Sequence, residues 1–260
     1  MTKYKAVFFD IDGTLVSFRT HKVPESACKA IGKLNESGIR TFISSGRHLW
    51  AINNLGDLKF DGYITINGGI TKVADHVISK TPISRADIVR LNDYIEHVHR
   101  FPCIFALEDR LVLNYYNEQV YELFDLLNFP DVPTADLRTL EQTDVYQVIA
   151  FFDEVEEPRI MSVLTDCASA RWHPMFSDVV PRGQSKVKGM EAVCNYYGID
   201  KAETIAFGDG GNDIEMLRWA GCGIAMGNAE DKVKTAADLV TDSVDDDGVW
   251  NALQKLCFAD

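Results

Sequence analysis

Strand-like and helix-like hydrophobic patterns alternate at both ends of the chain. Short, mostly apolar runs bounded by turn residues predict strands over residues 6–11, 39–44, 63–66, 204–207 and 223–226. Apolar residues at helical spacing predict helices over residues 24–37, 48–55, 186–197, 213–220 and 249–256. Strands and helices that alternate in this way indicate parallel strands joined by right-handed crossovers.

The middle of the chain has a different pattern. Helices are predicted over 84–99, 118–127 and 157–164, and strands over 103–107, 111–115, 146–152, 170–172 and 176–180. Helices followed by strand pairs indicate an antiparallel sheet with helices on one face. We therefore expect an inserted α+β domain at residues 82–180, within a core formed by residues 1–81 and 181–260.

The composition of the 260-residue chain is that of a folded globular protein, with 46% hydrophobic and 25% charged residues. A formal net charge of −13 repels nucleic acids and anionic membranes, and no apolar run approaches the ~18 residues of a membrane helix. The six cysteines lack the spacing of a zinc site, so buried free thiols are expected. These bounds predict a cytoplasmic enzyme or binding protein without a nucleic-acid or membrane partner.

Two of the predicted parallel strands end in carboxylates. Asp10 and Asp12 follow the first strand, and the strand at 204–207 leads into Gly208-Asp209-Gly210-Gly211-Asn212-Asp213. Ligands of open α/β sheets bind at the carboxyl ends of strands. The alternative without a site is that Asp12-Gly13 forms a turn and Asp10 caps a helix. If both ends meet at one sheet edge, repulsion among up to four carboxylates calls for a hard cation such as Mg²⁺. A dinucleotide loop is disfavoured because Asp213 replaces the third glycine of that motif.

Two further segments offer donors and positive charge for a phosphate group. Ser45-Gly46-Arg47 ends the second strand with a hydroxyl, a flexible backbone and a guanidinium. Lys186 lies at the predicted start of a helix, where backbone N–H groups also attract anions. Each segment alone is more often a helix cap or solvated surface. Their order along an alternating chain favours a shared site.

Together these motifs resemble those of a known family. Asp10-Ile11-Asp12-Gly13-Thr14, Ser45-Gly46-Arg47, Lys186 and the 208–213 segment are similar to the four motifs of the haloacid dehalogenase superfamily phosphatases. The Asn67-Gly68 turn and the long insert resemble, more narrowly, the Cof-type hydrolases with a type IIB cap. The resemblance covers nearly the whole chain. It implies an α/β fold, in which a Rossmann-like, doubly wound parallel sheet carries an inserted α+β cap.

The resemblance also implies a role for each motif residue. Asp10 would be the nucleophile that forms an aspartyl-phosphate, and Asp12 the general acid and base. The implied magnesium site comprises Asp10, the Asp12 backbone carbonyl, Asp209 and Asp213. The residues implied to hold phosphate or substrate are Ser45, Gly46, Arg47, Lys186 and Asn212, with Lys186 favoured over Lys188 by the sequence that precedes it.

The function implied by the resemblance is a Mg²⁺-dependent phosphatase for small phosphorylated metabolites, with sugar phosphates as the expected class. A phosphotransferase or phosphomutase shares the first half-reaction, and no motif separates these alternatives. A non-catalytic sensor of phosphorylated metabolites is a third alternative, which the presence of both Asp10 and Asp12 disfavours. The oligomeric state is not specified by the sequence.

Overall fold

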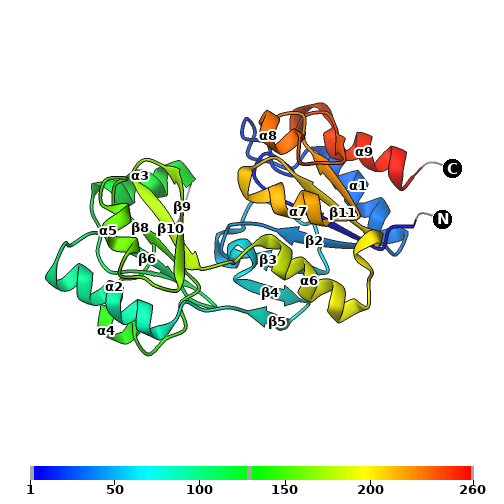
Figure 1. Ribbon diagram of the computed structural model, residues 1–260. Helices are drawn as coiled ribbons and strands as arrows, with labels where there is room; N and C mark the ends of the chain where they lie inside the picture. The colour runs from blue at the N-terminus through cyan, green and yellow to red at the C-terminus, as the bar shows by residue number, and fades with distance from the viewer. Residues whose placement is uncertain (1–2, 128–130, 259–260) are drawn as a thin grey trace. The chain divides into compact units, whose positions relative to one another are not determined.

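The computed structural model describes residues 3–127 and 131–258, which divide into two compact units. Unit 1 contains Met1–Lys80 and Ser185–Asp260, and unit 2 contains Thr81–Gln184. Each unit is built around its own sheet (Figure 1). Unit 2 begins one residue before and ends four residues after the expected insert of residues 82–180, and the last strand of the unit ends at Pro181.

Unit 1 is built on an eight-stranded sheet in the order β13-β12-β11-β1-β2-β3-β4-β5. Neighbours from β13 to β3 pair in parallel, whereas the last two pairings are antiparallel. The strands are β1 Ala6–Phe9, β2 Arg40–Ser44, β3 Gly62–Thr65, β4 Ile70–Val73, β5 His76–Lys80, β11 Thr204–Gly208, β12 Cys222–Ala225 and β13 Leu239–Val240. This mainly parallel sheet confirms the predicted α/β class.

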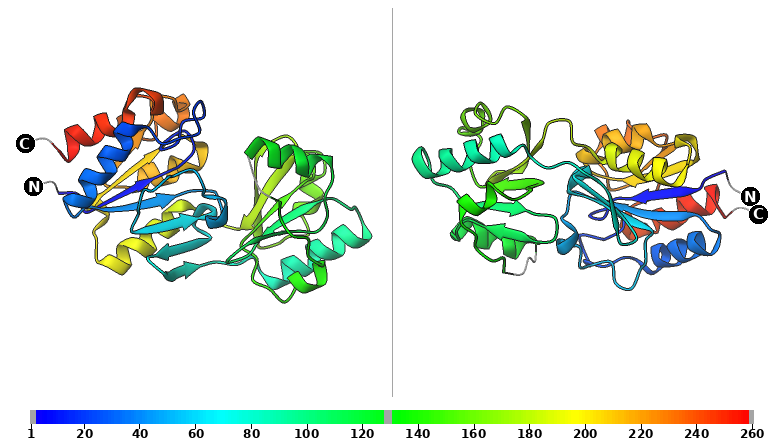
Figure 2. Two further views of the ribbon diagram at one scale, coloured as in Figure 1. Left: turned by 180° about the vertical axis from the view of Figure 1, so that it is seen from behind. Right: turned by 90° about the horizontal axis from the view of Figure 1, so that it is seen from below.

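Helices cover both faces of this sheet, as the right-hand view of Figure 2 shows. Helices α1 (Glu25–Glu36) and α9 (Gly248–Leu256) pack on one face. Helices α6 (Lys186–Tyr197) and α7 (Ile214–Trp219) pack on the other, together with the short α8 (Asp231–Lys234). The buried residues of α1, namely Ala27, Ala30, Ile31 and Leu34, form the single apolar stripe that packs an amphipathic helix on a sheet.

Strand β1 directs alternate side chains to the two faces of the sheet. Phe8 stacks on Phe42 on the α6 face, with 5.1 Å between ring centroids, and Phe9 stacks on Phe207 on the α1 face at 5.3 Å. Asp10 is the next residue and, by the two-residue period, returns to the α6 face. The first predicted carboxylate is thus at the carboxyl end of a central strand, on the side where α6 begins at Lys186.

Several parts of unit 1 differ from the predicted elements. Strands β4, β5 and β13 and helix α8 were not predicted. The helix predicted over 48–55 is only a 3₁₀ turn at Leu49–Ala51, because the Arg47 side chain donates to the Ala51 carbonyl (3.0 Å) and Ile52 is extended. The helix predicted over 213–220 begins as a separate 3₁₀ turn, Gly211–Asp213, and continues as α7.

Unit 2 is an α+β unit with a five-stranded antiparallel sheet in the order β7-β6-β8-β10-β9. Its strands are β6 Cys103–Ala106, β7 Leu111–Leu113, β8 Gln147–Ala150, β9 Cys167–His173 and β10 Phe176–Pro181. Its helices are α2 Arg85–His97, α3 Glu118–Leu127, α4 Leu137–Leu140 and α5 Glu157–Met161. Apolar residues of α2, α4 and α5 form one buried cluster with the sheet. The Ser84 hydroxyl caps α2 by accepting from the Asp87 N–H at 3.2 Å.

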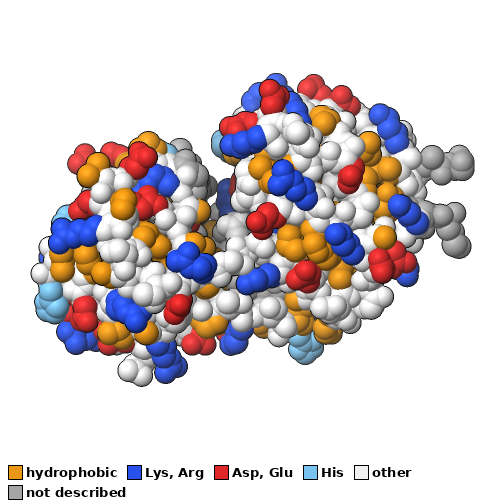
Figure 3. Space-filling view, in the orientation of Figure 1, with side chains coloured by type: hydrophobic (Ala, Val, Ile, Leu, Met, Phe, Trp, Pro, Cys, Tyr) orange, Lys and Arg blue, Asp and Glu red, His pale blue; other side chains and the backbone are white. Residues whose placement is uncertain are grey.

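Charged side chains of both signs are mixed over the face of the molecule drawn in Figure 3. The net charge of −13 is therefore not gathered into one patch of that face. Among the described residues, no helix has the length and apolar character that crossing a membrane requires.

Candidate active site

Asp10 is buried directly after β1, in contact with Lys186. Its side chain is 9% exposed, and Oδ1 accepts a hydrogen bond from Lys186 Nζ at 2.6 Å. The same ammonium group donates to Asp213 Oδ1 at 2.5 Å. Lys186 is only 1% exposed, so the first residue of α6 is a buried cation between two buried carboxylates. Lys188 is exposed, which leaves Lys186 as the lysine of this group.

Burial and charge shift the pKa values of this group. Burial, together with the Asp213 carboxylate, raises the pKa of Asp10 well above its usual value, although the Lys186 ammonium opposes this shift. Burial alone would lower the pKa of Lys186, but Asp10 and Asp213 raise it, so the ammonium keeps its proton at neutral pH. Burial also raises the pKa of Asp209 to about 6. Ionisation of these carboxylates is therefore unfavourable, and a bound cation would offset that cost.

The loop after β11 brings Asp209 and Asp213 to Asp10. Asp213 Oδ2 accepts from the backbone N–H groups of Asp209 and Gly210, at 3.0 and 2.9 Å, which fixes the turn. The Thr14 hydroxyl donates to Asp209 Oδ1 at 2.8 Å. One carboxylate oxygen from each of the three aspartates lies within 4.8 Å of the other two. A set of converging carboxylate oxygens fits Mg²⁺, which prefers hard oxygen ligands.

Asp12 forms an ion pair with Arg47. Nε and Nη2 of Arg47 donate to the two carboxylate oxygens at 2.7 and 2.8 Å, which makes the pair bidentate. The third guanidinium nitrogen, Nη1, donates to the Ala51 carbonyl. In the structure, the Arg47 guanidinium therefore binds the Asp12 carboxylate and the Ala51 carbonyl of its own loop. A contact between Arg47 and phosphate stays a prediction.

Asn67, a residue with no predicted role, contacts three of the residues implied to bind phosphate, namely Ser45, Gly46 and Asn212. Its N–H donates to the Ser45 carbonyl at 3.0 Å. The Ser45 hydroxyl is buried and accepts from the Arg47 N–H at 3.1 Å. Gly46 lies under the Asn67 carboxamide, because a Cβ built on Gly46 would be 3.2 Å from Asn67 Nδ2. The exposed Asn212 donates from Nδ2 to Asn67 Oδ1 at 3.0 Å.

Asn228 is a second residue that the sequence analysis missed. Its Nδ2 donates to the Gly13 carbonyl at 2.8 Å and to Asp209 Oδ2 at 3.3 Å. Gly13 itself has φ +84°, and a Cβ there would be 2.1 Å from Asp209 Oδ2, so only glycine fits against that carboxylate. Asn228 follows the parallel strand β12, beside β11. The rule that ligands gather at the carboxyl ends of parallel strands was therefore the signal that could have identified it.

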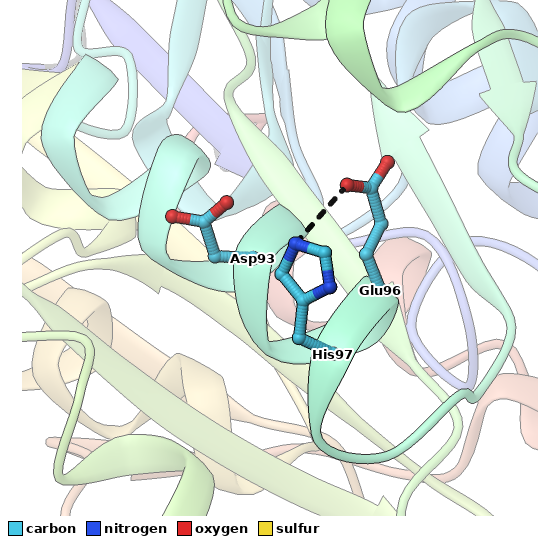
Figure 4. Close-up of side chains that lie close together, drawn as sticks. All are labelled: Asp93, Glu96 and His97. Carbon is cyan, nitrogen blue, oxygen red and sulfur yellow. Dashed lines mark ion pairs between the residues drawn. The ribbon is translucent and has the colours of Figure 1, made fainter.

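A different cluster of charged residues lies on α2 in unit 2. Asp93, Glu96 and His97 are all exposed, and His97 Nε2 is 3.9 Å from Glu96 Oε2 (Figure 4). Glu96 also forms an ion pair with Arg138 at 2.8 Å. Because solvent and an arginine already compensate these charges, we assign no site to this cluster.

Comparison with known proteins identifies the family of this chain. Residues 7–253 match the model of the haloacid dehalogenase-like hydrolases. The chain belongs to this family. The match covers the whole set of motif residues in unit 1, and it confirms the predicted family and the predicted hydrolase class.

Named relatives of this haloacid dehalogenase-like hydrolase are similar over nearly their full length. The phosphatase-named protein YkrA of Bacillus subtilis is 34% identical over 97% of this chain and 97% of its own. The 5-amino-6-(5-phospho-D-ribitylamino)uracil phosphatase YitU of the same organism is 29% identical, over 98% of each chain. A solved structure of the HAD subclass IIB sugar phosphatase BT4131 is 40% identical, with a TM-score of 0.87, and the match covers 96% of this chain and 98% of that one.

Proposed function

We propose that this protein is a Mg²⁺-dependent phosphatase that hydrolyses small phosphorylated metabolites, of the sugar phosphate class, through an aspartyl-phosphate on Asp10. The observation that carries the proposal is the buried Asp10 carboxylate, held 2.6 Å from Lys186 and grouped with Asp209 and Asp213. A carboxylate beside a fixed cation suits nucleophilic attack on a phosphoryl group. Support for the substrate class comes from the names of the relatives, one a sugar phosphatase and one a phosphatase of a phosphorylated ribityl compound.

The residues that would hold Mg²⁺ are Asp10, the Asp12 backbone carbonyl and Asp209, with Asp213 beside them. The four site carboxylates, counted with Lys186 and Arg47, leave two negative charges, which one divalent ion balances. When bound, the ion would offset the negative charge of the phosphate group and of the attacking carboxylate.

The chain's own residues account for both half-reactions. In the first, an Asp10 carboxylate oxygen bonds to phosphorus as the bond from phosphorus to the leaving oxygen breaks, and Asp12 donates a proton to that oxygen. In the second, Asp12 takes a proton from water as the water oxygen attacks phosphorus, which frees Asp10 and releases inorganic phosphate. Lys186 and the Ser45 hydroxyl donate to the non-bridging phosphate oxygens and stabilise their charge.

Unit 2, residues 81–184, would serve as the type IIB cap and supply the residues that select the leaving group. This assignment is part of the same proposal, supported by the separate α+β sheet of the unit. A panel of phosphate esters, with released phosphate as the readout, tests the substrate class. Transfer of the phosphoryl group to a second sugar hydroxyl, without release of phosphate, would contradict the hydrolase assignment.

The role of Asp10 is tested by Asp10→Asn, which removes the nucleophile with little change in volume. We expect a folded protein that releases almost no phosphate from any ester. The role of Asp12 is tested by Asp12→Asn with p-nitrophenyl phosphate, whose leaving anion needs no proton. We expect a burst of nitrophenolate that approaches one equivalent, followed by slow turnover, because the second step lacks its base. Full turnover in Asp10→Asn would overturn the mechanism.

A further inference from the structure

The turn formed by Ile66, Asn67 and Gly68 contacts three loops of the candidate site. The Asn67 N–H donates to the Ser45 carbonyl at 3.0 Å, which ties the turn to the loop after β2. Asn67 Oδ1 accepts from Asn212 Nδ2 at 3.0 Å, which ties it to the loop after β11. Gly68 lies against the start of α6, because a Cβ there would be 2.2 Å from the Ser185 carbonyl oxygen. One short turn therefore links the loops that carry Ser45, Lys186 and Asn212.

The backbone of this turn is strained. Ile66, Asn67 and Gly68 have φ of +53°, +49° and +91°, which is three left-handed residues in a row. The strain falls on Ile66, because a β-branched residue is a genuine outlier in this region and costs ~1–3 kcal/mol there, whereas glycine adopts it freely and asparagine is enriched in it. It persists only where the surroundings determine the conformation. Here hydrogen bonds from Ile66 N–H to the Arg47 carbonyl and from Gly69 N–H to the Ile66 carbonyl hold it in place.

The two polar groups of the Asn67 side chain differ in their contacts. Its Oδ1 accepts a hydrogen bond from Asn212, whereas no described residue accepts a hydrogen bond from its Nδ2. The Nδ2 group lies over Gly46, in the loop implied to hold phosphate. Asp209 and Gly13, by contrast, are bound by Asn228. Asn67 therefore contacts the phosphate-binding segments of the site, and Asn228 contacts the segments implied to bind metal.

We propose that Asn67 is a positioning residue for phosphate binding, which fixes Asn212 through its carboxamide and the Ser45–Arg47 loop through its backbone. The inference rests on the proposed phosphatase function, because it deepens the role of the same site. It requires Asn67 and Asn212 to act as one unit. It also requires the affinity for phosphate to depend on Asn67 while the affinity for Mg²⁺ does not.

Asn67→Gly isolates the carboxamide, because glycine adopts positive φ freely and keeps the turn conformation. Ala74→Gly is the matched control: Ala74 also has positive φ, +48°, and lies between β4 and β5, away from the site residues. Calorimetric titration of the full chain measures binding of inorganic phosphate at saturating Mg²⁺, and binding of Mg²⁺ without phosphate. The same titrations on Asn212→Ala and on the double variant Asn67→Gly/Asn212→Ala form a double-mutant cycle, which measures the coupling between the two residues.

Loss of one side-chain hydrogen bond predicts that Asn67→Gly weakens phosphate binding about three- to tenfold. Mg²⁺ binding should stay unchanged, and Ala74→Gly should change neither. Asn212→Ala should weaken phosphate binding by a similar factor, and the double variant by no more than either single change. Because Asn212 is exposed, its variant gives a result even if Asn67→Gly folds poorly.

Three results would overturn the inference. They are unchanged phosphate affinity in Asn67→Gly or in Asn212→Ala, losses that multiply in the double variant, and a loss of Mg²⁺ affinity equal to the loss of phosphate affinity. If the wild-type protein binds phosphate and Asn67→Gly binds it equally well, this inference alone fails. If the wild-type protein with Mg²⁺ binds no phosphate, both the proposed function and this inference fail.

Discussion

Replacing Lys186 with methionine tests the central contact of the site. Methionine keeps most of the side-chain volume but removes the ammonium group that lies 2.6 Å from Asp10 and 2.5 Å from Asp213. Removing one partner of a buried ion pair costs ~3–5 kcal/mol, because the remaining charge is left uncompensated. The cost of protonation sets an upper limit of similar size. Protonating one carboxyl with an ordinary pKa of 3.8 at pH 7 costs about 4 kcal/mol, and the wild-type protein already bears part of this cost because burial raises the pKa of Asp10; loss of the ammonium raises it further.

The stability lost in Lys186→Met should change with pH in a definite direction. A carboxyl that is protonated in the folded variant and ionised in the unfolded chain makes the folded state bind more protons, so stability falls by ~1.4 kcal/mol per unit as the pH rises. We expect the deficit of Lys186→Met, measured by guanidinium unfolding in EDTA, to widen from about pH 5 to pH 7. Lys188→Met, on the exposed lysine, is the control and should stay within ~0.5 kcal/mol of wild type. A loss for Lys186→Met below ~1 kcal/mol at pH 7, or one independent of pH, would refute the reasoning.

Two further predictions concern carboxylates held by neighbouring donors. In unit 2, burial alone would raise the pKa of Asp87, but hydrogen bonds from the Asp166 N–H, Arg90 and the Thr165 N–H hold it below its usual value. Asp87→Asn should therefore cost ~1–3 kcal/mol in urea unfolding at neutral pH, and the loss should shrink as the pH falls through the lowered pKa. The exposed Asp93→Asn on the same helix is the control, and an equal loss there would contradict the assignment. In unit 1, Asn228→Ala should weaken Mg²⁺ binding about tenfold or more in calorimetry, because Asp209 loses a donor that orients it. Unchanged Mg²⁺ affinity would show that Asn228 does not orient the ligand.

The sequence predicts an element well where both its ends and its apolar face are marked. The helix predicted over 186–197 is found at Lys186–Tyr197, between Ser185 and Gly198. Strands β5 and β13 were missed because they form the two edges of the sheet, where side chains such as Val77, Leu239 and Val240 are exposed. Short edge strands lack the apolar run that identifies a buried strand. Helix α8, with four residues, is too short to show a period.

The same distinction applies to the site. Motif order indicates which strand ends carry carboxylates, and the structure brings Asp10, Asp209 and Asp213 within 4.8 Å of one another. The partner of each side chain depends on turn geometry that the motifs do not encode. Ile66 is the clearest case. The Asn67-Gly68 pair indicates a turn, and both residue types favour positive φ, but nothing about a β-branched isoleucine predicts that it too has positive φ. The residue types also do not show that this turn contacts the loops that carry Ser45 and Asn212.

The pairing of Asp12 with Arg47 links two roles that the sequence assigned separately. A bidentate pair uses both oxygens of an ionised carboxylate, so in the proposed mechanism this arrangement would be the state in which Asp12 takes a proton from water. Before Asp12 donates a proton to a leaving group, the guanidinium has to release it, and an arriving phosphate offers Arg47 an equivalent bidentate partner. Arg47 would then hold Asp12 and phosphate in turn. Arg47→Lys keeps the charge without the fork, so we expect it to lower kcat more with sugar phosphates than with p-nitrophenyl phosphate, whose leaving anion needs no acid. Equal losses with both substrates would show that Arg47 does not control the proton on Asp12.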